Sequence, residues 1–321
     1  MTAPLVTVVM PTFNRLEYAR AAVASVYAQT CRDWELIVVD DGSDEETCSF
    51  LRRPPDARMS VIFHAHSGTP ALIRNCGISL ARGKYIAFLD SDDQWAADKL
   101  QRQIALMESA PARRWSYSAV RRIDADGHEI YGRSVQWAPH SGWILEQVLR
   151  VDAQIATPTV MAQTAFVREL GGFDENMRFI EDYDLWSRMA LRSEVSVEPA
   201  QLADVRSHTE QFTLDRIGGL EGWANLYAKM EGLVPSQQLR ALCRQRKREY
   251  LLLLAAQQAR VRDWSGMRRT AVTAALARAF SPRGWLRIAR AAALPARREA
   301  PRQSFQNPPR REDSPARERR E

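Results

Sequence analysis

The stretch Gly83-Lys84-Tyr85-Ile86-Ala87-Phe88-Leu89-Asp90-Ser91-Asp92-Asp93-Gln94-Trp95 joins a short apolar run to a cluster of carboxylates. Residues 84–89 are mostly apolar or aromatic and follow a glycine, which is typical of a strand buried in a parallel sheet. The three aspartates that follow repel one another unless a cation or strong hydrogen-bond donors lie between them. Oxygen ligands of this kind suit a hard divalent ion such as Mg²⁺ or Mn²⁺. The alternative is a polar turn in which Asp93 caps the next helix.

The residues before this stretch repeat the same pattern of a strand followed by polar side chains. We predict strands over 5–10, 34–39, 59–63 and 84–89, separated by helices over 16–29, 45–52 and 70–82. This alternation predicts an α/β fold with a parallel sheet and helices on both faces. Ligands bind such sheets outside the carboxyl ends of the strands. We therefore expect three clusters to converge in space, namely Thr12/Asn14/Arg15, Asp40/Asp41 and Asp90/Asp92/Asp93.

No glycine-rich phosphate loop follows the first predicted strand. A dinucleotide dehydrogenase needs G-x-G-x-x-G at that place, whereas residues 11–16 contain no glycine. The chain has no Walker A sequence either. A bound phosphate group would therefore depend on a metal ion, which agrees with the carboxylate cluster.

The next hundred residues mix strands and helices. Strands are predicted over 115–123 and 158–161, with a hairpin turn at 124–128 and helices over 96–109, 143–149 and 164–170. A further helix ending at Leu191 begins with Glu181, Asp182 and Asp184. Acidic residues at a helix start also interact favourably with the helix dipole, so their presence alone does not require a catalytic role.

Charge divides the chain unevenly. Its 321 residues carry a net charge of +6, but residues 240–298 hold fifteen Lys and Arg residues against two acids, a charge of +13. Residues 299–321 hold six Arg residues against five acids, which leaves residues 1–239 at −8. Helices are predicted over 214–230, 236–260, 263–280 and 283–294, and residues 295–321 have the composition of a disordered tail. The basic helices either lie on an anionic membrane surface or pack on the acidic body. No nucleic-acid partner is expected, because the basic residues lack aromatic stacking platforms.

Composition also indicates where the protein resides. Hydrophobic residues make up 45% of the chain, as in a soluble globular protein, and no run of about 18 apolar residues predicts a membrane span. The N-terminus lacks the basic region and cleavage site of a secretory signal. The four cysteines have neither metal-ligand nor disulfide-framework spacing. We therefore expect a cytoplasmic protein with reduced thiols. Any peripheral membrane contact is expected at the cytoplasmic face of the inner membrane.

Five motifs in a fixed order resemble those of the inverting glycosyltransferases of family 2, which have a GT-A fold. The resemblance covers about residues 4–210 and implies a Rossmann-like, mixed but mainly parallel sheet flanked by helices. It also implies a GT-A domain over 1–212. The helical region over 213–294 and the tail over 295–321, which are predicted from their own sequence, lie outside the resemblance. The motifs are Pro11-Thr12-Phe13-Asn14-Arg15, Val38-Val39-Asp40-Asp41-Gly42-Ser43, Arg74-Asn75-x-Gly77, Phe88-Leu89-Asp90-Ser91-Asp92-Asp93, and Gly171-Gly172-Phe173-Asp174 leading to Glu181-Asp182.

The resemblance implies a role for each matching residue. Asp182 would be the catalytic base and Asp92 a ligand of Mg²⁺ or Mn²⁺, while His208 fits a second metal ligand or a surface histidine equally well. Asp40 would accept a hydrogen bond from the base, which favours uracil, thymine or guanine because each has a ring N–H. The residues implied to bind the nucleotide sugar are Pro11, Thr12, Asn14, Arg15, Asp40, Asp41, Arg74, Asp90 and Ser91.

The resulting hypothesis is an inverting glycosyltransferase of the hexosyltransferase type. It would move a sugar from a nucleoside-diphosphate sugar, with UDP favoured, to a hydroxyl of a glycan or lipid-linked acceptor in cell-surface polysaccharide or glycolipid biosynthesis. The metal would neutralise the charge on the departing diphosphate. Two alternatives remain open: a nucleotidyltransferase, which normally has a glycine-rich phosphate loop, and a non-catalytic protein that binds nucleotide sugars.

Overall fold

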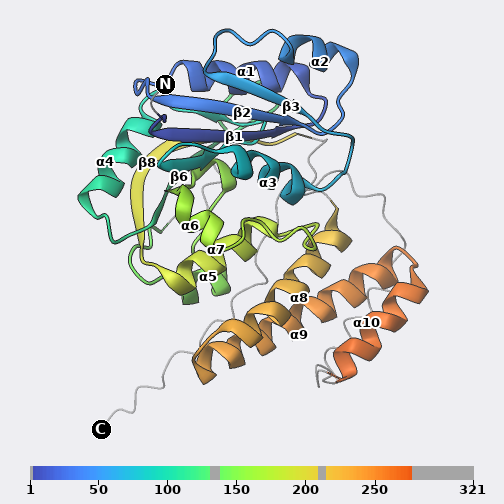
Figure 1. Ribbon diagram of the computed structural model, residues 1–321. Helices are drawn as coiled ribbons and strands as arrows, with labels where there is room; N and C mark the ends of the chain where they lie inside the picture. The colour runs from blue at the N-terminus through green and yellow to red at the C-terminus, as the bar shows by residue number, and fades with distance from the viewer. Residues whose placement is uncertain (1–2, 131–137, 209–214, 277–321) are drawn as a thin grey trace.

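The computed structural model describes residues 3–130, 138–208 and 215–276 and shows a mixed α/β fold (Figure 1). Within these residues, eight strands form one sheet in the order β3-β2-β1-β4-β7-β6-β8-β5. The strands are β1 (Val6–Thr12), β2 (Trp34–Asp40), β3 (Met59–Phe63), β4 (Tyr85–Phe88), β5 (Gln94–Trp95), β6 (Trp115–Ile123), β7 (Met161–Gln163) and β8 (Val195–Arg206).

The predicted parallel half of the sheet is confirmed. β1 lies between β2 and β4 and pairs in parallel with both, and β2 pairs in parallel with β3. Side chains alternate between the faces of β1, so Val8 packs with α1 (Leu16–Tyr27) and Val9 packs with α3 (Pro70–Leu80). Figure 1 shows α1 and the short α2 (Glu45–Leu51) on one side of these strands and α3 on the other. This alternation explains why each strand is apolar throughout.

The other half of the sheet differs from the sequence-based expectation. Residues 158–161 were expected to form a strand, but residues Thr157–Thr159 form a 3₁₀ turn and the strand β7 begins at Met161. Pro158 has no backbone N–H to donate to a sheet, which favours the turn. The helix expected from residue 96 begins at Lys99 because β5 precedes it, so Asp93 is not the helix cap; Asp98 holds that position. The helix expected over 164–170 spans Thr164–Glu169, with Gln163 rather than Thr164 at its N-cap position.

Strand β8 was not predicted, although it is twelve residues long. Its sequence contains Pro199 and several polar residues, which hide the alternation that marks a strand. It pairs in parallel with β6, with register shifts near Ala119, and its far end pairs with β5. Four helices accompany this half of the sheet: α4 (Lys99–Ser109), α5 (Leu145–Arg150), α6 (Thr164–Glu169) and α7 (Glu181–Arg192).

The expected C-terminal helices are present as α8 (Arg216–Leu233), α9 (Gln237–Arg260) and α10 (Trp264–Leu276), below the sheet in Figure 1. Asp215 and Ser236 cap the first two through bonds to the N–H groups of Gly218 and Leu239. One apolar core runs from Phe88 in the sheet to Leu254 in α9. In the described part of the chain, no helix is both long and apolar enough to cross a bilayer. The helix predicted over 283–294 and the tail predicted over 295–321 lie outside the described residues.

Candidate active site

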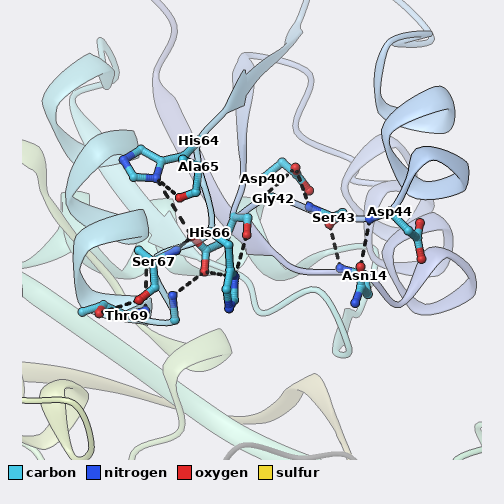
Figure 2. A network of polar contacts seen from close by, with 12 residues as sticks. Asn14, Asp40, Gly42, Ser43, Asp44, His64, Ala65, His66, Ser67 and Thr69 are labelled. Carbon is cyan, nitrogen blue, oxygen red and sulfur yellow. Dashed lines mark hydrogen bonds and ion pairs between the residues drawn. The ribbon is translucent and has the colours of Figure 1, made fainter.

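The loops after β1 and β2 are bound to each other at the carboxyl edge of the sheet. The N–H of Asn14 donates to Ser43 Oγ at 2.6 Å, and Asn14 Oδ1 accepts from the N–H of Asp44 at 2.9 Å (Figure 2). Asn14 and Arg15 both have left-handed backbone conformations, with φ of 56° and 63°. Consecutive non-glycine residues rarely adopt this conformation, and such strain concentrates at functional sites.

Asp40 has one carboxylate oxygen in use and one without a partner. Asp40 is 1% exposed and lies at the end of β2. It is in register with Thr12 of β1, and Pro11 precedes Thr12 in that strand. Its Oδ2 accepts from the N–H groups of Gly42 and Ser43 at 3.2 and 3.1 Å (Figure 2). Its Oδ1 is buried with no hydrogen-bond partner among the described residues. A buried acceptor without a donor is costly, so this oxygen is suited to a ligand N–H.

Asp41 is engaged differently from Asp40. Its two oxygens accept from the N–H groups of Ser67 and Gly68 at 2.7 and 3.0 Å, and His66 Nδ1 lies 3.2 Å from Oδ2 (Figure 2). The ring of His66 stacks on Phe13 with centroids 4.2 Å apart. Asp41 therefore fixes the loop beside Asp40. Sequence reasoning gave no role to His66 or Phe13, although His66 follows the third strand at the same edge of the sheet.

Arg74 joins three segments that are far apart in the sequence. Its guanidinium donates to Asp90 Oδ1 at 2.6 Å and to Glu181 Oε1 at 2.8 Å. Arg74 is 6% exposed, and its Nε has no hydrogen-bond partner within the described part of the chain. This pair of bonds places the loop after β4 next to the start of α7.

The aspartates after β4 do not converge on one point. Asp92 Oδ2 accepts from Arg15 Nη1 at 2.8 Å and lies 2.9 Å from His208 Nε2, whereas Asp93 accepts from the N–H of Arg206 at 2.9 Å. Burial alone would raise the pKa of Asp92, but the hydrogen bond from His208 and the charge of Arg15 lower it. Burial and the charge of Asp92 hold the pKa of Asp93 well above its usual value. Within this cluster, Asp92 and His208 therefore place two atoms that can bind a metal ion, a carboxylate oxygen and an imidazole nitrogen, 2.9 Å apart.

Arg206 holds the turn that contains Ser91 and Asp92. Its Nε donates to the carbonyl oxygen of Asp92 at 2.9 Å, and its Nη1 donates to the carbonyl oxygens of Asp124 and Ala125. Arg206 and Ser91 are buried. The end of β8, which sequence reasoning missed, therefore fixes the backbone on which Asp92 is carried.

Asp182 is the second residue of α7. Its Oδ1 accepts from the N–H of Tyr183 at 2.7 Å, and its Oδ2 accepts from Thr157 Oγ1 at 3.5 Å. Burial and the adjacent charge of Glu181 raise the pKa of Asp182 to about 7. A carboxylate with a pKa near neutrality can both take and release a proton at physiological pH.

A different Asp–His cluster lies on the turn after β6. Donor atoms of Asp124, Asp126 and His128 lie within 4.8 Å of one another, and Asp126 and His128 are exposed. The Asp124 carboxylate accepts from the N–H groups of the other two residues. Those bonds are the ones that close a polar turn, so the cluster has a structural explanation without an ion.

The sequence model of the family described as Glycosyl transferase family 2 matches residues 7–163 of the chain. That span contains Asp40, Arg74 and Asp92 but ends before Asp182 and His208. An uncharacterized glycosyltransferase from Rickettsia bellii is 34% identical over 208 residues, which are 65% of this chain and 29% of the relative. The UDP-Glc:alpha-D-GlcNAc-diphosphoundecaprenol beta-1,3-glucosyltransferase WfgD of Escherichia coli is 39% identical over 103 residues, 32% of this chain and 41% of the relative.

Solved structures share the fold at low sequence identity. The S. aureus protein TarS (residues 1–349) in complex with UDP-GlcNAc has a TM-score of 0.62 and 18% identity, over 77% of this chain and 71% of that one. The mannosyltransferase PcManGT of Pyrobaculum calidifontis, with GDP-Man and Mn2+, has a TM-score of 0.59 and 20% identity, over 91% and 87% of the two chains. The predicted GT-A fold is confirmed. The chain spans about a third of the length of the first curated relatives that it matches.

Proposed function

This chain belongs to glycosyltransferase family 2 over residues 7–163, and we propose that it is an inverting glycosyltransferase that uses a UDP-sugar. One observation carries this proposal: Arg74 ties Asp90 to Glu181, which places the base candidate Asp182 beside the loop that holds Asp92. This contact supports a reaction in which Asp92 acts on the diphosphate side and Asp182 on the acceptor side, at one edge of the sheet. The division into a GT-A domain, a helical region and a tail remains part of the proposal.

The donor nucleotide is proposed to bind over the ends of β1, β2 and β4. The unpartnered Oδ1 of Asp40 accepts the ring N–H of the base, a group present in uracil and guanine and absent from cytosine. UDP is favoured because WfgD and TarS are named with UDP-sugars. Asp41 shapes the adjoining loop, and Asp90 is assigned to the ribose. The remaining residues of the donor site are Pro11, Thr12, Asn14, Arg15, Arg74 and Ser91.

Asp92 and His208 are the proposed ligands of a divalent ion. Their facing atoms fit such an ion, because a carboxylate oxygen and an imidazole nitrogen suit Mn²⁺ and, through the oxygen, Mg²⁺. The neighbour PcManGT was solved with Mn2+. A bound ion would neutralise negative charge on the departing diphosphate. Arg15, which now contacts Asp92, supplies a second positive charge at that place.

The chain's own part in the chemistry is assigned to Asp182. Its carboxylate accepts the proton of the acceptor hydroxyl as the hydroxyl oxygen bonds to the anomeric carbon. The bond from that carbon to the diphosphate oxygen breaks, and the electron pair leaves with the nucleoside diphosphate. Attack on the face opposite the leaving group inverts the anomeric configuration, by the same stereochemical logic as in inverting hydrolases. Asp182 ends protonated and returns its proton to solvent.

The proposed acceptor is a glycan or a lipid-linked molecule, and the proposed location is the cytoplasmic face of a membrane. WfgD is named for a diphosphoundecaprenol-linked acceptor. Two exposed apolar residues, Val261 at 51% and Trp264 at 46% exposure, lie at the turn between α9 and α10. Arg268 lies one helical turn beyond Trp264, next to Arg269, and both are exposed. We name these four residues the α9–α10 corner; aromatic and basic residues together favour an anionic lipid surface.

The experiment that tests the proposal measures products. The full-length protein is incubated with Mn²⁺, a panel of UDP-, GDP- and CDP-sugars, and lipid-linked acceptors. We expect acceptor-dependent release of UDP, and NMR of the product should show an anomeric configuration opposite to that of the donor. In a parallel reaction with nucleoside triphosphates and a sugar 1-phosphate, release of pyrophosphate would instead identify a nucleotidyltransferase. Binding of the nucleotide sugar without release of a nucleoside diphosphate would identify a non-catalytic protein.

A further inference from the structure

Two glycines of α8 contact the segment that immediately precedes the proposed base. A Cβ atom at Gly222 would lie 2.8 Å from the carbonyl oxygen of Phe179 and 3.0 Å from Cγ1 of Ile180. A Cβ atom at Gly218, one turn earlier, would lie 2.1 Å from Cε2 of the Phe179 ring. The distances of 2.8 and 2.1 Å are shorter than a real Cβ contact, so α8 approaches residues 179 and 180 too closely for a side chain at either position.

The segment touched by α8 has a strained backbone. Ile180 is the N-cap of α7 and has φ of 64° and ψ of 19°, in the left-handed region. A β-branched residue in this region is a rare outlier, and such a conformation persists only where surrounding contacts enforce it. Ile180 packs against the main apolar core and against Gly222. The direction in which α7 starts, and so the position of residues 181 and 182, depends on this conformation.

The same helix also contacts the residues that follow the base. Trp223 of α8 packs on Tyr183 with ring centroids 4.8 Å apart. Lys229, two turns further along α8, lies 2.7 Å from the fully buried carboxylate of Asp184. Contacts from α8 therefore reach both sides of Asp182, at residues 179–180 and at residues 183–184.

We propose that α8 is the element that positions Asp182 for proton transfer, with Gly222 and Gly218 as its positioning residues. This inference rests on the function proposed for Asp182. The two glycines do not touch the reacting atoms; they act through the backbone of Phe179 and Ile180. Misplacement of a catalytic group by about 1 Å can cost on the order of 10²-fold in rate, so the close approach of α8 has a functional consequence beyond packing.

Gly222→Ala is the main test, and Gly232→Ala is its matched control. Gly232 lies on the same helix with nothing within 4 Å of its Cβ position. Alanine at 222 meets a backbone oxygen that cannot move without moving Ile180. We expect kcat to fall by about 10- to 10²-fold while the Kd for the donor nucleotide is unchanged. Gly232→Ala should leave both quantities at their wild-type values.

Hydrogen exchange supplies a readout that does not depend on activity. The amide of Asp184 donates to the carbonyl oxygen of Ile180 at 3.0 Å, so it reports on the start of α7. In Gly222→Ala we expect faster exchange at residues 180–186 and unchanged exchange in β1, β2 and β4. If no donor is turned over by the wild type, the proposed function fails, whereas wild-type exchange and wild-type kcat in Gly222→Ala would overturn the role of α8.

Two further variants cover the case in which Gly222→Ala does not fold. In Gly218→Ala the three atoms nearest to the new methyl group all belong to the Phe179 ring, so the added change Phe179→Leu should restore kcat. Ile180→Gly keeps a left-handed conformation that glycine adopts without strain, so it should fold but lower kcat by releasing α7. Failure of Phe179→Leu to restore Gly218→Ala, together with wild-type kcat in Ile180→Gly, would contradict the proposal.

Discussion

The loops after β1 and β2 are held by backbone N–H groups and short polar side chains, whereas the start of α7 is held by side chains from distant parts of the chain. In the first region, Asn14, Ser43 and Asp40 bind groups within the two adjoining loops. In the second, Arg74 contacts Glu181 from more than a hundred positions earlier in the sequence. Helix α8 contacts residues 179 and 180 from about forty positions later. We name the first the nucleotide region and the second the acceptor region, after the roles proposed for them. Local motifs set the first, while the second depends on tertiary packing.

The largest effect is expected at the boundary of the two regions, from Asp92→Ala. Loss of a metal ligand removes several kcal/mol of charge stabilisation, so turnover should become undetectable while the circular dichroism spectrum is unchanged. Wild-type activity should disappear in chelator and return with Mn²⁺ or Mg²⁺. Asp126→Ala, on the exposed Asp–His turn, is the matched control. Loss of the metal-dependent activity in Asp126→Ala but not in Asp92→Ala would move the metal site to that turn.

In the acceptor region, Asp182→Asn is expected to lower kcat by about 10²–10⁴-fold, with donor binding nearly unchanged. Because the pKa of Asp182 is raised to about 7, its carboxylate is protonated below that pH and cannot take a proton. Wild-type kcat should therefore fall with decreasing pH below about 7, and this limb should be absent from the residual activity of Asp182→Asn. If Glu181→Gln were the crippling change and Asp182→Asn mild, the base would be Glu181.

In the nucleotide region, Asp40→Ala is expected to weaken UDP binding by roughly 1–3 kcal/mol, because a base N–H loses its buried acceptor. Calorimetry with UDP and CDP provides the measurement. Asp40→Ala should reduce the preference for UDP over CDP. Asp41→Asn, which disturbs the loop at 66–68, should weaken the binding of both nucleotides to the same extent. An unchanged affinity for UDP in Asp40→Ala would show that another residue recognises the base.

These two regions also differ in how far the sequence predicts them. The continuous apolar runs of β1, β2 and β4 and the polar residues after them predicted both the parallel strands and the convergence of Asn14, Arg15 and Asp92. The strand β8 was not predicted because Pro199 and polar residues interrupt its alternation of apolar and polar side chains. Arg74 was assigned to the nucleotide, but its bond to Glu181 depends on how α7 packs, and no local pattern encodes that distance. The glycines at 218 and 222 resembled ordinary helix residues for the same reason.

The smallest effect concerns the α9–α10 corner. Each Arg near an anionic surface contributes about 1 kcal/mol, so the double change Arg268→Glu and Arg269→Glu should reduce co-sedimentation with anionic vesicles at low salt. Arg52→Glu with Arg53→Glu, which alters the charge equally at the end of α2, should have little effect. If the unmodified protein stays in the supernatant with anionic vesicles at low salt, the basic helices serve only to pack on the acidic body.

The apolar core that joins Phe88 to Tyr227 and Leu254 has a consequence for how the molecule comes apart. Residues of β4, α8 and α9 lose their contacts together, so heating should melt the sheet and these helices in one cooperative transition. A fragment ending near residue 212 would expose the apolar side of α7 to water and is expected to aggregate. We therefore expect the helices to fold together with the sheet, so any fragment made to test the proposed activity has to include them.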